Sequence, residues 1–193
     1  MKPTVVVMLK EPQPGRVKTR LGREIGMVPA AWWFRHQTRG LLRRLGADPR
    51  WHLCLAVSPD AAGQTSRVWP ASLPRMPQGT GSLGDRMTRI LRAPIPGPLL
   101  IIGADIPGIT PRTLSAALLA LRGHDAVLGP APDGGYWCIG RAARVALPPT
   151  VLEGVRWSTA FALEDTLRAL GSLRIAQAPT LADVDTAQDL RGP

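Results

Sequence analysis

Short apolar runs alternate along this chain with longer segments whose apolar positions repeat at helical spacing. The runs TVVVML (4–9), WHLCLAV (51–57) and PLLIIGA (98–104) are mostly apolar and have the length of strands, and the run 98–104 is uniformly apolar, as in a buried strand. Helical patterns cover 28–45 and 83–92, which lie between these runs. This alternation is typical of parallel strands joined by crossover helices. We therefore predict an α/β fold with a mostly parallel central sheet and helices on both of its faces.

The segment 28–45 is the longest predicted helix. Its apolar residues fall on one face, which we expect to be buried, although Arg35 and Thr38 interrupt that face. The residues assigned to the buried face are Val28, Ala31, Trp32, Leu41, Leu42 and Leu45. Gly46 is placed to end the helix.

The C-terminal half carries shorter elements. DAVLG (125–129) and YWCIG (136–140) are two short strands around a loop that contains glycines. The segment 158–171 has the pattern of a helix, and either Ser158 or Thr159 is a suitable cap for its first turn. These elements continue the domain without a linker or a repeat.

Size and composition fit a single domain over residues 1–193. Hydrophobic residues make up 45% of the chain and charged residues 20%, as in ordinary globular proteins. No window approaches the roughly 18 apolar residues that a membrane span requires. The opening MKPTVVVMLKEP resembles a first strand more than a signal peptide, so the cytoplasm is the expected location. The sequence does not indicate an oligomeric state.

The chain is strongly basic. It has 24 Lys plus Arg against 14 Asp plus Glu, a net charge of +10, which favours anionic partners. The arginines are scattered and no nucleic-acid recognition motif is present, so a small molecule that carries phosphate explains the charge as well as nucleic acid does. A compositional bias of the genome is a third explanation.

Ligands of open parallel sheets bind beyond the carboxyl ends of the strands, and the loop 9–22 follows the first predicted strand. It contains Gly15 and the cations Arg16, Lys18 and Arg20. Glycine allows the backbone to approach a phosphate and the cations neutralise its charge. A solvated basic loop is the alternative interpretation.

A second candidate segment is PQGTGSLGDRM (77–87). Gly79, Gly81 and Gly84 precede a predicted helix, so backbone N–H groups there can face a base or a phosphate. Glycine clusters are also common in flexible connectors, and this alternative stays open.

A third candidate is Asp105, which ends the buried run 98–104. A carboxylate in this place is suited to hold Mg²⁺ or Mn²⁺ against a diphosphate, or it caps the turn that follows it. Asp185 near the C-terminus has the same two alternatives, a second metal ligand or a helix cap. Two separated aspartates and a basic loop together favour a site for a diphosphate and a metal ion.

The fourth candidate segment is GPAPDGGYWCIG (129–140). Asp133-Gly134-Gly135 is a tight-turn signal, which a hairpin explains by itself. In a functional interpretation the glycines leave room for a substrate ring on which Tyr136 or Trp137 stacks.

In chain order, KEPQPGRVKTRLG, QGTGSLGDRM, LIIGADIPGIT, AVLGPAPDGGYWCIG, VRWSTAFALEDT and ADVDTAQDL resemble the DUF2064 family. Its members are relatives of GT-A-type nucleotide-diphospho-sugar transferases and are described as glycosyltransferases. The resemblance runs across nearly the whole chain. It implies one Rossmann-like GT-A domain, similar in fold to molybdenum-cofactor guanylyltransferases and phospholactate guanylyltransferase.

The resemblance also implies roles for individual residues. Asp105 and Asp185 match metal ligands for Mg²⁺ or Mn²⁺, and Asp105 and Lys18 are the expected catalytic residues. The resemblance does not supply a general base; an inverting transferase needs one near the acceptor, and Asp133 is the available candidate. The residues expected to bind the nucleotide are Lys10, Gly15, Lys18, Arg20, Gly79, Gly84 and Arg86. The residues expected on the acceptor side are Gly134, Gly135, Tyr136, Trp157 and Ser158.

The leading functional hypothesis is a metal-dependent transferase that takes a sugar from a nucleotide sugar and passes it to a small-molecule acceptor. A nucleotidylyltransferase that uses an NTP and releases pyrophosphate is the runner-up, and Lys18 and Arg20 soon after the first strand favour it. A nucleotide-binding module without catalysis is the third alternative.

Overall fold

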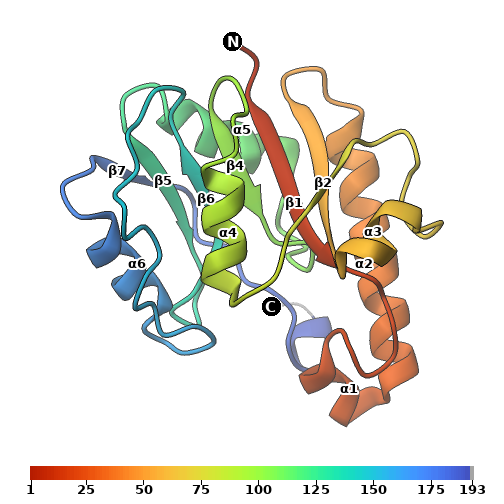
Figure 1. Ribbon diagram of the computed structural model, residues 1–193. Helices are drawn as coiled ribbons and strands as arrows, with labels where there is room; N and C mark the ends of the chain where they lie inside the picture. Colours follow the sequence, from red (N-terminus) through yellow and green to blue (C-terminus); the bar gives the residue numbers. More distant parts are fainter. Residues whose placement is uncertain (192–193) are drawn as a thin grey trace.

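Seven strands form one sheet in the computed structural model, which describes residues 1–191 (Figure 1). The strands are β1 (Thr4–Lys10), β2 (His52–Ser58), β3 (Arg75–Pro77), β4 (Leu99–Ile102), β5 (Ala126–Pro130), β6 (Tyr136–Arg141) and β7 (Ile175–Gln177). Their order across the sheet is β3-β2-β1-β4-β6-β5-β7. All neighbouring pairs are parallel except those that involve β6. The expected mostly parallel sheet and the β5–β6 hairpin are confirmed.

Helices cover both faces of this sheet, as the uniformly apolar strands require. The helices are α1 (Thr19–Ile25), α2 (Met27–Gly46), α3 (Asp60–Thr65), α4 (Leu83–Leu91), α5 (Pro111–Ala120), α6 (Ala162–Leu170) and the 3-10 turn η1 (Asp189–Arg191). In Figure 1, α4 lies in front of the sheet and α5 behind it. None of the helices in residues 1–191 has the length and apolar character that a membrane-spanning helix needs.

Alternate residues of β1 build two core layers. Val5 and Val7 point to the layer that α2 and α5 cover, where they pack with Leu41 and Leu114. Val6 points to the opposite layer, which contains residues of α4 and α6. Because successive side chains of a strand face opposite sides, the part of a strand that is buried on both faces must be apolar, as residues 5–9 of β1 are.

The helix predicted over 28–45 is present as α2, but its buried face differs from the prediction. Val28 and Trp32 are 55% and 58% exposed, because the first turns of α2 lie beside α1 past the end of the sheet (Figure 1). Thr38, predicted to interrupt the buried face, is fully buried instead. Its Oγ1 donates a hydrogen bond to the carbonyl oxygen of Ala104, which satisfies the hydroxyl inside the core.

The sequence did not predict three short elements, and it placed the start of one helix too early. The elements α1, α3 and β3 are each seven residues or fewer, too short to produce a clear hydrophobic period. The helix α6 begins at Ala162, later than predicted, and neither Ser158 nor Thr159 caps it. Ser158 has a φ of 61°, in the left-handed region, so the chain turns here before the helix begins.

Candidate active site

A cavity of about 680 Å³ lies at the carboxyl ends of β1 and β4. Its walls come from the end of β1, the loop 16–20, the segment 101–106 after β4, the β5–β6 loop, the segment 157–160 and the C-terminal segment. The crevice beyond the carboxyl ends of parallel strands is the usual ligand site of such sheets. Lys10, Arg16, Lys18 and Arg20 all line it, so the basic loop faces a shared cavity rather than bulk solvent alone.

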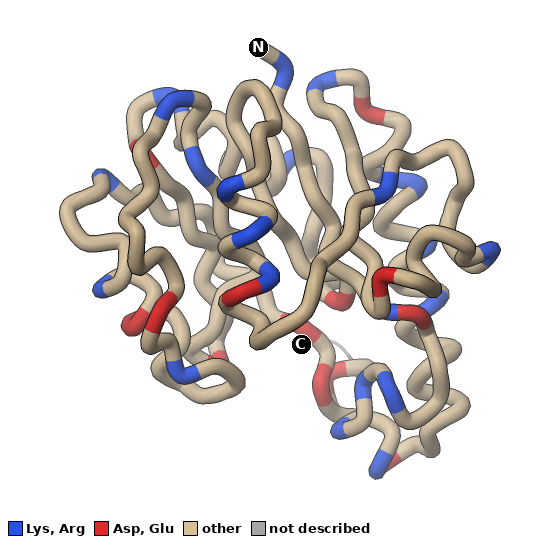
Figure 2. Tube along the Cα trace, in the orientation of Figure 1, with Lys and Arg blue, Asp and Glu red and all other residues tan. Residues whose placement is uncertain are grey.

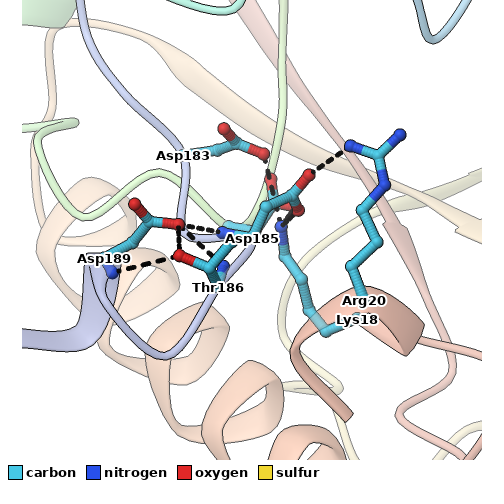
Figure 3. Close-up of polar contacts among 7 residues, drawn as sticks. Lys18, Arg20, Asp183, Asp185, Thr186 and Asp189 are labelled. Atoms are coloured by element: carbon cyan, nitrogen blue, oxygen red, sulfur yellow. Dashed lines mark hydrogen bonds and ion pairs between the residues drawn. The ribbon is translucent and has the colours of Figure 1, made fainter. Parts of the chain in front are cut away.

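Lys18 is the central charged residue of the cavity. It stands immediately before α1 with φ 45° and ψ 48°, a left-handed conformation that is uncommon for a residue other than glycine. Its Nζ lies 2.6 Å from Oδ2 of Asp105, 2.8 Å from Oδ1 of Asp185 and 3.4 Å from Oδ2 of Asp183. Figure 3 shows the lysine pointing toward the aspartates of the C-terminal segment, with Arg20 paired to Asp185 from the other side.

Charge and burial compete at this cluster. Burial disfavours the ammonium of Lys18, yet attraction to Asp105 and hydrogen bonds to Asp105 and Asp185 raise its pKa above the ordinary lysine value. Burial likewise disfavours the charge on Asp185, but hydrogen bonds from Lys18 and Arg20 keep the pKa of that carboxyl below its usual value. Burial raises the pKa of Asp183. Lys18 is therefore a fixed positive charge at neutral pH.

The C-terminal segment returns to this edge of the sheet. The backbone N–H of Ala187 donates to Oε2 of Glu24 in α1, and Val184 packs with Leu21. In Figure 2 the acidic positions of this segment lie beside the basic positions at the start of α1. Before the last turn, Oγ1 of Thr186 accepts a hydrogen bond from the N–H of Asp189, and Oδ2 of Asp189 accepts one each from the N–H groups of Asp185 and Thr186. The capping role that had been one alternative for Asp185 is thus taken by Thr186.

Asp105 faces the cavity as well. Its carboxylate pairs with Lys18, while the turn after it closes through a backbone bond from the N–H of Ile109 to the carbonyl oxygen of Ile106. Within residues 1–191 Asp105 pairs with Lys18 and does not cap this turn, and its role as a metal ligand stays a prediction.

The donor chemistry of the cluster fits a divalent ion such as Mg²⁺ or Mn²⁺. These ions prefer oxygen ligands, and oxygens of Asp105 and Asp185 both lie within 3 Å of one point, the Nζ of Lys18. In the described part of the chain no group of three or more His, Cys, Asp or Glu side chains forms a ready-made metal cluster. The ammonium of Lys18 stands between the carboxylates instead.

The glycine-rich segment before α4 is held firmly in place. Asp60 accepts hydrogen bonds from the N–H groups of Gln78 and Gly79. The Nε2 of Gln78 donates to carbonyl oxygens of β1 and β2, and Arg89 donates to the carbonyl oxygen of Gln78. This network argues against a flexible connector. Of the nucleotide residues predicted here, Gly79, Gly84 and Arg86 do not line the cavity, although Leu83 and Met87 of α4 do.

The β5–β6 loop and the segment 157–160 form the opposite wall. Gly134 has a φ of 82°, and a Cβ there would lie 2.1 Å from the carbonyl oxygen of Ala160. Asp133 lines the cavity, and its Oδ1 accepts a hydrogen bond from the N–H of Gly135, which orients the carboxylate. Because glycine has no Cβ, Gly134 allows the β5–β6 loop and the segment 157–160 to approach this closely.

Two aromatic side chains complete this wall. Tyr136 and Trp157 line the cavity with their rings edge to face at 6.3 Å. Thr166 donates a hydrogen bond to the hydroxyl of Tyr136, and burial raises the pKa of that hydroxyl, so it stays protonated at neutral pH. Trp157 also packs on Gly84, where a Cβ would lie 2.9 Å from its indole nitrogen. Gly84 is thus a packing residue beneath this wall.

An ion pair anchors the segment that carries Trp157. The backbone N–H and Nε of Arg156 both donate to Oδ2 of Asp165 in α6, at 3.1 and 2.8 Å, and Nη2 donates to Oδ1. These hydrogen bonds lower the pKa of Asp165. The guanidinium of Arg156 also stacks on the ring of Phe161.

The structure brings most of the predicted site residues to one cavity. Those that line it are Lys10, Lys18, Arg20, Asp105, Asp133, Gly135, Tyr136, Trp157, Ser158 and Asp185. Gly15 and Gly134 lie in the same loops but outside the lining. Sequence reasoning assigned no role to Asp183, although its spacing of two from Asp185 would have placed both side chains on one side of an extended segment.

Comparison with known protein families gives a match for this chain. The family model described as "Uncharacterized protein conserved in bacteria (DUF2064)" matches residues 41–159, more than half of the chain. The chain belongs to the DUF2064 family. A comparison with curated proteins finds none that matches this DUF2064 protein.

Solved structures support the fold of this DUF2064 protein. A protein from Desulfovibrio desulfuricans G20, provisionally named a nucleotide-diphospho-sugar transferase, is 30% identical with a TM-score of 0.83, over 98% of this chain and 84% of that chain. Rv0371c from Mycobacterium tuberculosis H37Rv, solved in complex with manganese, is 18% identical with a TM-score of 0.54, over 99% and 97% of the two chains.

A nucleotide-bound structure has the same fold. CMP:2-keto-3-deoxy-manno-octonic acid synthetase, solved with CTP, is 12% identical with a TM-score of 0.60, over 99% of this chain and 96% of that chain. At identities this low the likeness shows the fold alone. The predicted Rossmann-like α/β fold of nucleotide-diphospho-sugar transferases is confirmed.

Proposed function

We propose that this protein is a transferase that binds a nucleotide sugar, with Mg²⁺ or Mn²⁺, and passes the sugar to a small-molecule acceptor. The observation that carries the proposal is the Lys18 cluster, in which carboxylates suited to a divalent ion and a basic loop face one cavity. The relative from D. desulfuricans, which is 30% identical over nearly the whole chain, carries a name of this kind.

The chain's own charges would do most of the chemical work. Lys10, Arg16, Lys18 and Arg20 place positive charge along one wall, where it would stabilise the negative charge that develops on a departing diphosphate. Asp105 and Asp185 are the residues that would hold the divalent ion, and the ion would supply further positive charge beside the phosphates.

Asp133 is our candidate for the general base on the acceptor side. It lines the cavity on the wall that also carries Trp157 and Ser158, and the N–H of Gly135 orients its carboxylate. The other groups with acid or base chemistry on this wall are less suitable. Burial raises the pKa values of the Tyr136 hydroxyl and the Cys138 thiol, so both stay protonated at neutral pH.

A nucleotidylyltransferase is the second candidate, and a specific observation favours it. Lys10, Arg16, Lys18 and Arg20 follow β1 closely and line the same cavity, and cations gathered in this way suit the phosphates of an NTP. In this reaction the protein would bind an NTP and a phosphorylated acceptor, and pyrophosphate would leave.

Two measurements test the proposal. A thermal-shift screen of nucleotide sugars and NTPs, each with and without Mn²⁺, should reveal a ligand that raises the melting temperature only when the metal is present. Product analysis then separates the candidates, because sugar transfer releases a nucleoside diphosphate and nucleotidyl transfer releases pyrophosphate. If no nucleotide stabilises the protein with Mn²⁺, the proposed function is wrong. Binding without turnover of any donor would favour a non-catalytic nucleotide-binding module.

A further inference from the structure

The ammonium of Lys18 stands where a divalent ion between Asp105 and Asp185 would have to stand. Oxygens of both aspartates lie within 3 Å of its Nζ, and Asp183 contributes a third oxygen at 3.4 Å. Only 6% of the lysine side chain is exposed, so the ammonium lies within the cluster rather than at its rim. Two cations cannot share this space, because they would repel each other at a distance of a few ångströms.

We propose that Lys18 and the divalent ion compete for the same carboxylates, so that Lys18 must leave the cluster when the ion enters. This inference takes the identity of the ion from the proposed function. It goes beyond that function because it gives the Lys18 side chain two positions, one with the ion absent and one with the ion bound. Mg²⁺ requires oxygens at about 2.0–2.1 Å, a shell that an ammonium in contact with the same oxygens prevents.

The released lysine has a suitable destination. Lysine has a flexible stem, and Lys18 stands on a loop rather than within a helix, so its ammonium can move while the backbone stays in place. Lys10, Arg16 and Arg20 line the same cavity, which makes this wall the region where phosphate oxygens would be held. Lys18 would therefore exchange carboxylate partners for phosphate partners.

This exchange predicts cooperative binding. A divalent ion alone must displace an ammonium that three carboxylates hold, so it should bind weakly. Phosphate that accepts the displaced ammonium lowers this cost, and by linkage the nucleotide and the ion should each strengthen the binding of the other.

Mn²⁺ binding without any nucleotide tests the competition directly. In Lys18→Met the competing charge is absent, so we expect Mn²⁺ to bind about tenfold more tightly than in the wild type, as followed by the electron paramagnetic resonance signal of free Mn²⁺. Arg16→Met is the matched control, because Arg16 lines the same cavity and forms no ion pair within residues 1–191. Equal or weaker Mn²⁺ binding in Lys18→Met would overturn the proposal.

A second measurement uses the wild-type protein and does not depend on how the variant folds. The chain has three lysines, Lys2, Lys10 and Lys18, so acylation of each amine can be followed by mass spectrometry. Saturating Mg²⁺ should increase the labelling of Lys18 several-fold while the labelling of Lys2 stays constant. Unchanged labelling of Lys18 at saturating Mg²⁺ would show that the lysine and the ion bind side by side.

These outcomes are distinct from failure of the proposed function, because neither measurement includes a nucleotide. Competition without nucleotide binding would retain the inference and reject the transferase. Metal-dependent nucleotide binding without competition between Lys18 and the ion would retain the proposed function and reject the inference.

Discussion

Oδ2 of Asp105 lies 2.6 Å from Nζ of Lys18, which joins the segment after β4 to the residue before α1. Neither residue lies in a regular element, and each follows a strand of the parallel sheet in the chain. This contact places the acid of one loop against the base of another at the edge where ligands of such sheets bind.

Replacement of Asp105 by asparagine should weaken Mn²⁺-dependent nucleotide binding. The amide keeps the size of the side chain but removes the charge that a divalent ion requires, and we expect a loss of about 10–100-fold in affinity. Isothermal titration with and without Mn²⁺ measures it. Asp125→Asn is the matched control, since Asp125 pairs with Arg174 on the surface and does not line the cavity. If Asp105→Asn binds nucleotide with unchanged Mn²⁺ dependence, the metal assignment is wrong.

Replacement of Gly134 by alanine should displace the cavity wall that the β5–β6 loop and the segment 157–160 form. The new methyl group would meet the carbonyl oxygen of Ala160 at 2.1 Å, in addition to the strain of a left-handed φ. Gly154→Ala provides a matched control, because Gly154 has a φ of 69° and open space around it. Backbone strain should lower the free energy of unfolding of each variant by about 1 kcal/mol, and the contact with Ala160 should lower that of Gly134→Ala measurably further. Urea unfolding measures both changes. If the two variants lose the same free energy of unfolding, the segment 157–160 moves away from the new methyl group at no cost, and the prediction is wrong.

Replacement of Arg141 by methionine should destabilise the fold without affecting the site. The buried guanidinium donates to carbonyl oxygens of Leu91, Ala93, Ile95, Gly97 and Ala142. Their loss should reduce the free energy of unfolding by at least about 2 kcal/mol, because buried acceptors are left without donors.

Urea unfolding measures this change, and nucleotide affinity measured below the unfolding transition should stay the same. Arg122→Met is the control, an exposed arginine at the end of α5 whose loss should change stability by less than about 0.5 kcal/mol. A change in Arg141→Met as small as that of the control would contradict the structural role of the guanidinium.

At low pH the pair of Arg156 and Asp165 should stop stabilising the protein. Hydrogen bonds from Arg156 hold the pKa of Asp165 below its ordinary value. A carboxyl whose pKa is lower in the folded state stabilises the fold above its unfolded pKa, about 3.9, and loses that contribution as the pH falls through the folded pKa.

The stability difference between the wild type and Asp165→Asn should therefore be constant from about pH 7 to pH 5 and shrink below about pH 4. Urea unfolding across this range measures it. Glu164→Gln is the control, because Glu164 forms an exposed ion pair with Arg168 and its replacement should change the free energy of unfolding little at any pH in this range. A difference that persists undiminished in strong acid would refute the assignment of the stabilisation to this pair.

Motif reasoning predicted the candidate site better than it predicted the details of packing. Lys18 and Asp105 were singled out by residue type and by position after a strand, and Asp185 as an aspartate near the C-terminus; the structure places the three in one cluster. Gly84 was expected to face a nucleotide, whereas it packs under Trp157, since the sequence does not say which side chain lies above a glycine. The ligand roles of all these residues remain predictions.

The sequence by itself determined the major strands and helices, because burial on both faces leaves continuous apolar runs in β1 and β4, and burial on one face leaves a helical period of apolar residues in α4. Only the tertiary structure decided that Lys18 meets Asp105 and Asp185. That contact requires β1 and β4 to be neighbours and the C-terminal segment to return beside α1, and such long-range pairing leaves no local period in the chain. The same limit explains Trp32, whose exposure depends on where the sheet ends beneath α2.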